Sequence, residues 1–235
     1  MLLHYIKFFI RFINRTRTYF FINILGLAFA IACSLLLYNY SSFHRSFDKF
    51  HANSEQIVRV TMDVKLGSEE LREATTMPPL AKALEEDFEE VTGTVRLFDP
   101  NLFDKAILVS RGSTSFKENE ILFVDSTFFQ LFSFRLTEGS YENCLQKPYS
   151  VVITQRIKEK YFGSDNALGE QLILNNETYL VTGISENPPT NSHFTFDILA
   201  SIYSIKRPRL DVWINTPFYT YVRLRDAKFR FFSLN

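Results

Sequence analysis

The chain has 235 residues, of which 46% are hydrophobic and 22% are charged, and its formal net charge at pH 7 is zero. This composition excludes an intrinsically disordered chain and a membrane protein with many spans. It also argues against a nucleic-acid partner, because binding to phosphates requires an excess of basic residues on one face.

Residues 1–18 carry the basic side chains Lys7, Arg11, Arg15 and Arg17 and no acidic one. Polar and basic residues recur there every three to four positions, and isoleucine and phenylalanine occupy the positions between them. This periodicity predicts a basic amphipathic helix that lies in the cytoplasmic interface of a membrane.

An uncharged segment follows. As a helix, residues 19–40 would be about 33 Å long, which is enough to cross a hydrocarbon core of about 30 Å once. Aromatic residues at both ends of the segment suit the two headgroup layers. More basic residues precede the span than follow it closely, which predicts a cytoplasmic N-terminus, a location in the cell inner membrane, and a periplasmic region over 41–235.

A cleaved secretory signal is the alternative interpretation of this segment. Ala28 and Ala30 offer a small-residue cleavage site, but the apolar run continues through Leu37, beyond that site. The preceding basic region is also long for the head of a signal peptide. We therefore favour a retained membrane helix.

Three small or weakly polar residues, Asn23, Gly26 and Ser34, lie within the predicted span. Such residues let a second helix approach closely, which predicts packing against a partner helix. They also occur in isolated anchors, so both readings remain open.

The region after the span is predicted to be α+β, with strands dominant. A strand is expected over 57–64, a helix after Pro78 and Pro79 with a solvated acidic face, and a strand over 91–97. A β-rich subdomain is expected at about 101–195. Further strands are expected at 106–110, 120–124, 149–154, 171–174, 178–184, 194–199 and 218–224, with one helix at 155–162.

Motifs that would name a reaction are absent from the sequence. It has no phosphate-binding glycine loop, no nucleophile elbow and no pair of histidines at helical spacing, and Cys33 and Cys144 have neither a disulfide nor a metal-site pattern. His193 follows a proline-rich turn and His51 lies near Asp48; we predict that both form hydrogen bonds to loop backbone rather than perform acid–base chemistry. We expect no catalytic residue, no metal and no cofactor.

A series of short motifs extends along nearly the whole chain. NILGLA at 23–28 is followed by FDKFH at 47–51, IVRV at 57–60, FFQLFSF at 128–134, SVVIT at 150–154, YFG at 161–163, ALGEQL at 167–172, VTGI at 181–184, PTNSHF at 189–194 and YTYVRL at 219–224. In this order they resemble ABC transporter permeases of the FtsX/MacB type, with a MacB-like periplasmic core domain, in the form common among Bacteroidetes. The positions that carry the resemblance include Phe47, Asp48, Phe50, His51, Tyr161, Phe162, Gly163, Gly169, Gly183, Ser192 and His193.

The resemblance implies a non-catalytic membrane subunit. In such transporters a separate cytoplasmic ABC ATPase hydrolyses ATP, and the permease passes the resulting motion to an extracytoplasmic domain that helps to export or extract substrates. Family members continue into an FtsX-like region with three more membrane helices, and the sequence shows no second apolar run of spanning length. We therefore expect that the chain does not transport alone and is a truncated permease, a split-gene product or a remnant of a permease. A second permease copy, or a chain that supplies the missing helices, is the expected partner.

Two other classes of function remain open. A single-pass anchored binding or sensing domain requires only the elements predicted above. An exported hydrolase would require a perturbed carboxylate or a histidine pair in a deep cleft.

Overall fold

The computed structural model describes residues 4–5, 11, 17–66, 69–103, 106–206, 210–213 and 217–228. The amphipathic helix predicted over 1–18 lies mostly outside the described residues, as do the phenylalanines near the C-terminal end of the sequence. His4, Tyr5 and Arg11 are helical. The chain divides into two units, residues 1–47 and 48–235, which we describe separately.

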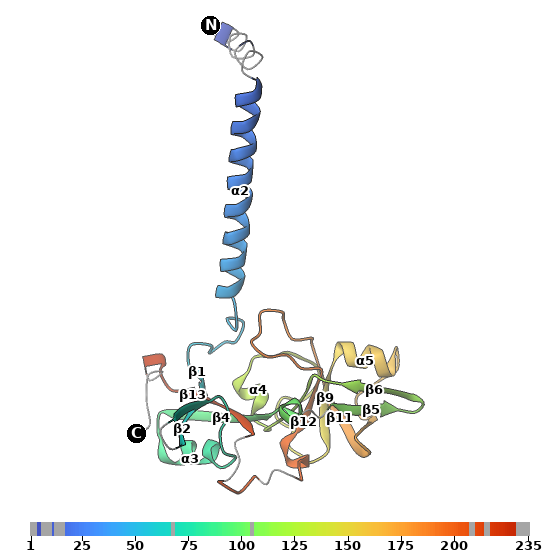
Figure 1. Ribbon diagram of the computed structural model, residues 1–235. Helices are drawn as coiled ribbons and strands as arrows, with labels where there is room; N and C mark the ends of the chain where they lie inside the picture. The colour runs from blue at the N-terminus through green and yellow to red at the C-terminus, as the bar shows by residue number, and fades with distance from the viewer. Residues whose placement is uncertain are drawn as a thin grey trace. The chain divides into compact units, whose positions relative to one another are not determined.

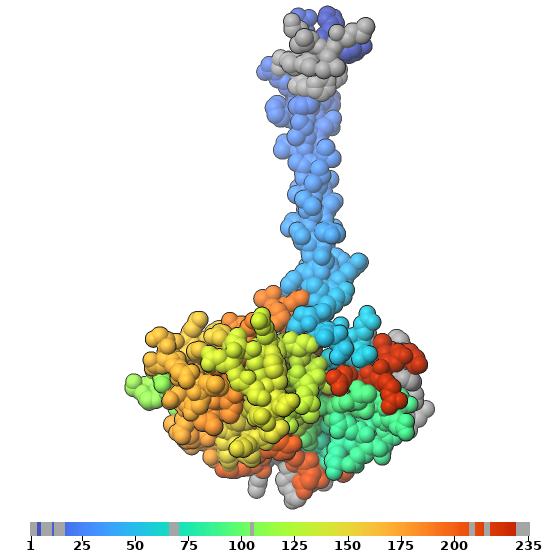
Figure 2. Space-filling model, turned by 180° about the vertical axis from the view of Figure 1, so that it is seen from behind, coloured from blue at the N-terminus to red at the C-terminus, as the bar shows by residue number. Residues whose placement is uncertain are grey.

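The first unit is dominated by the helix α2 (Arg17–Arg45), in which no residue is buried (Figure 2). Among the described residues it is the one helix that is long and apolar enough to cross a bilayer. The Ser34 hydroxyl donates a hydrogen bond of 2.8 Å to the Ala30 carbonyl of the same helix, so this polar group is satisfied within the span. Beyond the helix, the Phe47 ring packs against Phe43 and His44.

The second unit is built on a mixed sheet of eleven strands (Figure 1). Its order is β1-β13-β4-β7-β12-β9-β11-β10-β5-β6, with β8 paired to β11. Only β7 with β12 and β9 with β11 run parallel; the other pairs are antiparallel. The strands are β1 (Ile57–Val60), β4 (Val91–Phe98), β5 (Ile107–Arg111), β6 (Thr114–Glu118), β7 (Ile121–Val124), β8 (Leu136–Gly139), β9 (Ser150–Thr154), β10 (Gln171–Leu174), β11 (Glu177–Ser185), β12 (Ile198–Ser201) and β13 (Phe218–Leu224).

Smaller elements complete the unit. A separate hairpin pairs β2 (Met62–Leu66) with β3 (Glu69–Glu73). The α-helices are α3 (Leu80–Asp87), α4 (Phe128–Leu131) and α5 (Gln155–Phe162), and the 3₁₀ turns are η1 (Pro100–Phe103) and η2 (Ile202–Ser204). Helix α3 packs against β4 and β13, and α5 packs against β9 and β11 (Figure 1).

Alternation along the strands places a core on each face of the sheet. Phe98, Phe123 and Phe218 belong to the cluster that includes the buried residues of α5. Their neighbours along the strands, such as Leu97 and Leu122, belong to a second cluster with α4. Side chains two residues apart share a face, so both faces of the central strands are apolar.

Most of the predicted elements are confirmed. The strands at 171–174 and 218–224 and the helix at 155–162 have the predicted bounds, and the acidic residues around α3 are mostly exposed. The strand expected over 57–64 is instead two strands, β1 and β2. The prediction of a strand over 194–199 is wrong in its start, because Asp197 and Ile198 both donate to the Glu120 carbonyl and the ladder begins only at Ile198.

Three strands and one α-helix were not predicted: β3, β6, β8 and the short helix α4. The expectation that 155–162 is the one helix in its interval is therefore wrong. α4 is a single turn whose phenylalanines are buried, and four residues are too few to show helical periodicity in a sequence.

Candidate functional site

Asp48, at the start of the sheet unit, is bound to the loop between β11 and β12. Asp48 has a φ of 58°, a conformation that aspartate adopts more readily than most residues. Its N–H donates to the Asn191 carbonyl at 2.9 Å. Its Oδ1 accepts from the His193 N–H at 3.0 Å and lies 2.8 Å from His193 Nδ1. Two motifs that are more than a hundred residues apart in the sequence therefore meet here.

His193 continues this row of contacts to β13. Its Nε2 lies 2.8 Å from the Tyr221 hydroxyl, and Tyr221 is buried in the middle of the strand. Burial raises the pKa of Tyr221 to about 12, and the nearby Arg59 guanidinium opposes that rise. The prediction that His193 bonds to loop carbonyls is wrong for its ring, because the ring nitrogens contact a carboxylate and a phenol.

His51 is buried beside this row. Its Nδ1 accepts from the Ser133 N–H at 3.0 Å, and the Ser133 hydroxyl accepts from the Ala52 N–H at 2.9 Å. Burial lowers the pKa of His51 to about 4, although the Asp48 carboxylate opposes the change. The imidazole is therefore neutral at physiological pH and packs with the rings of Phe50, Phe132 and Phe134. His51 is predicted to donate to a loop carbonyl; its ring instead accepts from a loop N–H, and its Nε2 is buried without a hydrogen-bond partner among the described residues. We call Asp48, His51, Ser133, His193 and Tyr221 the Asp48 cluster.

A cavity of about 340 Å³ opens next to this cluster. It lies over one face of β1, β13, β4 and β7, because Arg59 pairs with Tyr221 and Tyr219 pairs with Leu97 across neighbouring strands. The volume is within the range of small-molecule sites. The lining residues are Arg59, Leu97, Asp99, Asn101, Asn119, Glu120, Leu122, His193, Phe194, Thr195, Tyr219 and Tyr221.

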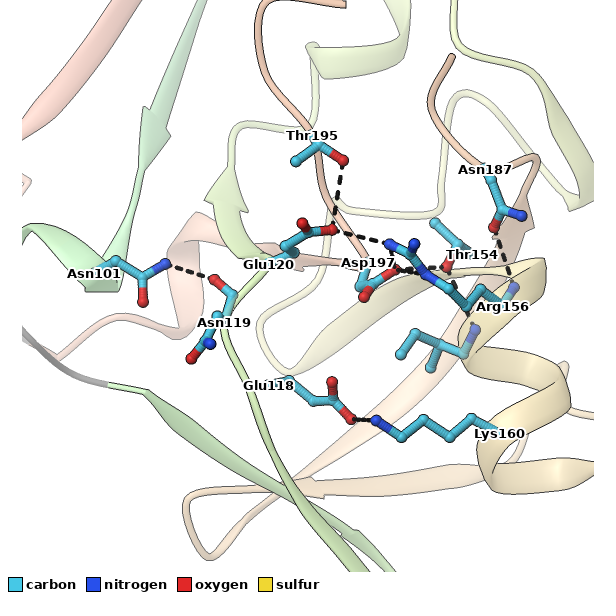
Figure 3. A network of polar contacts seen from close by, with 11 residues as sticks. Asn101, Glu118, Asn119, Glu120, Thr154, Arg156, Lys160, Asn187, Thr195 and Asp197 are labelled. Carbon is cyan, nitrogen blue, oxygen red and sulfur yellow. Dashed lines mark hydrogen bonds and ion pairs between the residues drawn. The ribbon is translucent and has the colours of Figure 1, made fainter. Parts of the chain in front are cut away.

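One side of the cavity is held by the polar network in Figure 3. The Arg156 guanidinium, at the start of α5, contacts Asp197 Oδ1 at 2.8 Å through Nε and Glu120 Oε2 at 2.9 Å through Nη2. Thr195 also donates to Glu120, at 3.4 Å. In Figure 3 the Asn101 amide points toward the Asn119 backbone, and it donates to that carbonyl at 2.5 Å. The network joins α5 to the starts of β7 and β12.

The remaining motif residues lie elsewhere in the sheet unit and make structural contacts. The Tyr161 hydroxyl donates to Glu118 at 2.6 Å, and the Arg111 guanidinium lies 4.1 Å from the centroid of the Phe162 ring. Gly163 ends α5, and the Gly169 N–H donates to the Val181 carbonyl. Gly183 and Ser192 complete the set: Gly183 lies at a register shift between β9 and β11, and Ser192 donates its N–H to the Pro189 carbonyl.

Sequence reasoning missed Arg59, Ser133 and Tyr221, although all three lie within quoted motifs. Strand pairing brings Arg59 beside Tyr221, and the loop that follows α4 brings Ser133 to His51. Neither contact has a local signal in a single sequence. Asp48 and Tyr221 contact the two ring nitrogens of His193 and could orient its imidazole. The raised pKa of Tyr221 disfavours its hydroxyl as a nucleophile. In the part of the chain that the structure describes, no group of three or more metal-ligating side chains comes together.

Three solved structures share this fold with the chain. A domain of a protein described as a permease from Porphyromonas gingivalis has a TM-score of 0.64 and 21% identity, over 75% of this chain and 76% of that chain. The periplasmic region of MacB from Actinobacillus actinomycetemcomitans has a TM-score of 0.54 and 13% identity, over 77% and 78%. The extracellular domain of the noncanonic ABC-type transporter YknZ from Gram-positive bacteria has a TM-score of 0.52 and 13% identity, over 74% and 84%.

Among curated proteins, none matches this sequence. The family model described as the MacB-like periplasmic core domain matches residues 20–228, which include most of α2 and nearly all of the sheet unit. A match over most of the chain is sufficient to assign the chain to this family. The chain belongs to the MacB-like periplasmic core domain family of ABC-type permeases.

Proposed function

We propose that this chain is a non-catalytic permease subunit of an ABC-type export or extraction system. Residues 1–18 lie on the cytoplasmic face of the inner membrane, 19–40 cross it, and 41–235 are periplasmic, with a β-rich subdomain at about 101–195. A cytoplasmic ABC ATPase supplies the energy, and a second permease copy or another chain supplies further membrane helices. The sheet unit responds to ATPase-driven motion without performing chemistry itself.

One observation carries this proposal: the family match runs without a break from the membrane helix into the sheet unit. The contacts of Asp48 support it. Asp48 follows the helix closely in the chain and is hydrogen-bonded to the loop at Asn191 and to His193, which in turn contacts β13. A displacement of Asp48 would therefore act on β13, next to the edge strand β1, rather than on a loose linker.

The face of α2 that would contact another helix carries Asn23, Gly26 and Ser34. At 100° per residue these three positions fall within an arc of about 80°. A Cβ atom added at Gly26 would meet nothing within 4 Å in this chain, so any close contact there must come from a partner. Small residues on one face of a membrane helix permit such an approach.

The test uses the full chain, affinity-tagged and purified from membranes of the native host together with its bound proteins. We expect an ABC ATPase to copurify and to hydrolyse ATP. Gly26→Leu should lower that hydrolysis several-fold because the added side chain separates the helices. Ala28→Leu adds a bulky side chain on the opposite face of the helix and should leave the rate unchanged.

Absence of any ATPase from the purified material would contradict the proposed partner. It would favour the second candidate, a single-pass anchored binding or sensing domain, which the cavity of about 340 Å³ supports. Equal hydrolysis by the two leucine variants would contradict the packing role of Gly26 while leaving the partner in place.

A further inference from the structure

We infer that the cavity beside the Asp48 cluster binds a short zwitterionic peptide with an apolar side chain. This inference goes beyond the proposed function and does not depend on it, because it concerns binding by the sheet unit alone. It is carried by the charges and shape of the cavity lining.

The cavity holds one cation and one anion that have no ionic partner among the described residues. Arg59 is exposed on β1 and forms no ion pair with any of them, and neither does Asp99, which follows β4. One Asp99 carboxylate oxygen accepts from the Asn101 N–H at 2.9 Å. The third charged residue, Glu120, lies 2.9 Å from Arg156, a guanidinium that it shares with Asp197. Arg59 and Asp99 are therefore the charged lining residues that have no ion pair with a described residue, and their opposite signs favour a ligand that carries both.

Strand register sets the distance between these two charges. Arg59 pairs with Tyr221, Tyr219 pairs with Leu97, and Asp99 lies two residues beyond Leu97 on the same face. The Cα atoms of Arg59 and Asp99 are thus separated by two strand spacings, about 10 Å, across the sheet and by four residues, about 13 Å, along it. Both residues line the cavity, so their side chains can reach toward each other within it, and an extended peptide of about three residues, about 10 Å long, can contact both.

Apolar and amide groups lie between the charged ends. Leu97, Leu122 and Tyr219 form a floor on which an apolar side chain can be buried, and Phe194 adds a ring from the loop above. The Asn119 carboxamide makes no hydrogen bond to a described residue and is available to a peptide group. A floor of this kind with a few polar groups at its rim is typical of sites that bind a small organic ligand.

The assay is isothermal titration calorimetry with the full chain in detergent micelles and the tripeptide Ala-Leu-Ala as the probe. We expect the peptide with free ends to bind. Its N-acetylated form and its C-terminal amide should each bind about tenfold more weakly or worse, because each loses a charge-assisted hydrogen bond.

Variants assign each end of the peptide. Arg59→Gln should remove the preference for a free carboxylate and keep the preference for a free amine, and Asp99→Asn should do the reverse. Arg72→Gln and Asp63→Asn alter an exposed ion pair on the β2–β3 hairpin and serve as matched controls that should bind like the wild type.

Two results would overturn the inference. One is equal affinity for the free and the blocked peptides. The other is no binding of the free peptide up to about 10 mM by a chain whose circular dichroism shows it to be folded. Because no ATPase is present in this assay, either result would leave the proposed coupling role unaffected, and a missing ATPase partner would leave the peptide site unaffected.

Discussion

At the scale of single residues, two buried polar groups of the sheet unit show how burial acts on charge. His51 is kept neutral by its surroundings, with a pKa of about 4 against an ordinary value of 6.5. Arg96 and Asp125 form a two-fold contact, with Nε to Oδ2 at 2.9 Å and Nη2 to Oδ1 at 2.8 Å. His51 is stable in its site only without a charge, whereas Arg96 and Asp125 each require the charge of the other. A change of pH should therefore affect the first, and removal of one charged group should affect the second.

His51 should make the sheet unit less stable as the pH falls from about 6.5 to about 4. In this window the unfolded chain binds a proton at His51 and the folded chain does not, so unfolding is favoured. The loss is up to about 3 kcal/mol and is complete below the folded pKa. Chemical denaturation of the full chain at pH 7 and pH 4.5 measures it. His51→Phe should remove this part of the pH dependence; an unchanged slope would contradict the assignment.

Asp125→Asn should lower the free energy of unfolding by about 3 kcal/mol, because it leaves the Arg96 guanidinium with an uncompensated charge in a mostly buried position. The side chains of Arg96 and Asp125 are 14% and 11% exposed. Asp63→Asn is the matched control, since Arg72 and Asp63 are 76% and 63% exposed. Its effect should be within about 0.5 kcal/mol. Urea denaturation compares the two, and similar losses would show that burial does not set the cost.

At the scale of elements, the sheet depends on places where two backbones approach closely. Gly139 ends β8 with a φ of 102° and pairs with Gly183 of β11. A Cβ atom at Gly139 would lie 2.6 Å from the Thr182 carbonyl oxygen, whereas one at Gly169, with a φ of 85°, would meet nothing within 4 Å. Both positions require a positive φ, but only at Gly139 would an added side chain also overlap with neighbouring backbone atoms.

Gly139→Ala should therefore destabilise the chain more than Gly169→Ala. The positive φ costs about 1 to 2 kcal/mol at each position. Steric overlap at Gly139 should add about 1 to 3 kcal/mol, because β8 must move away from β11. Thermal or chemical unfolding of the two variants measures the difference. Equal losses would mean that β8 adjusts without cost.

At the scale of the whole molecule, the chain combines an uncovered apolar helix with a sheet whose own core is closed. Nothing in α2 is buried, while the sheet unit holds clusters of buried side chains on both faces. Such a helix is stable only where its side chains are removed from water, as they are in a bilayer.

Phe29→Asp should remove most of the chain from the membrane fraction. Phe29 lies near the middle of the predicted span and is 73% exposed. A charge at the centre of a membrane helix costs about 2.5 to 3.5 kcal/mol on insertion scales. Alkaline carbonate extraction followed by immunoblotting measures the membrane fraction. Phe29→Leu keeps the position apolar and should remain in the pellet; an aspartate variant that also remains there would contradict a transmembrane α2.

The sequence alone determined the long apolar helix, most of the strands and the two helices α3 and α5. These features depend on local periodicity and on turn residues such as Pro78 and Pro79, which neighbours in the chain define. The series of motifs also indicated the permease family, because the order of motifs along the chain can be read without knowing which residues contact one another.

Only the tertiary structure decided which motifs meet. Asp48 and His193 are separated by more than a hundred residues, and the cavity is formed where Arg59 pairs with Tyr221 and Tyr219 pairs with Leu97 across three strands. Strand order and register in a mixed sheet depend on long-range packing of apolar faces, and a single sequence carries no local record of that packing. The same physical reason explains why the Asp48 cluster and the cavity could not be found from the sequence, although several of their residues lie in the motifs.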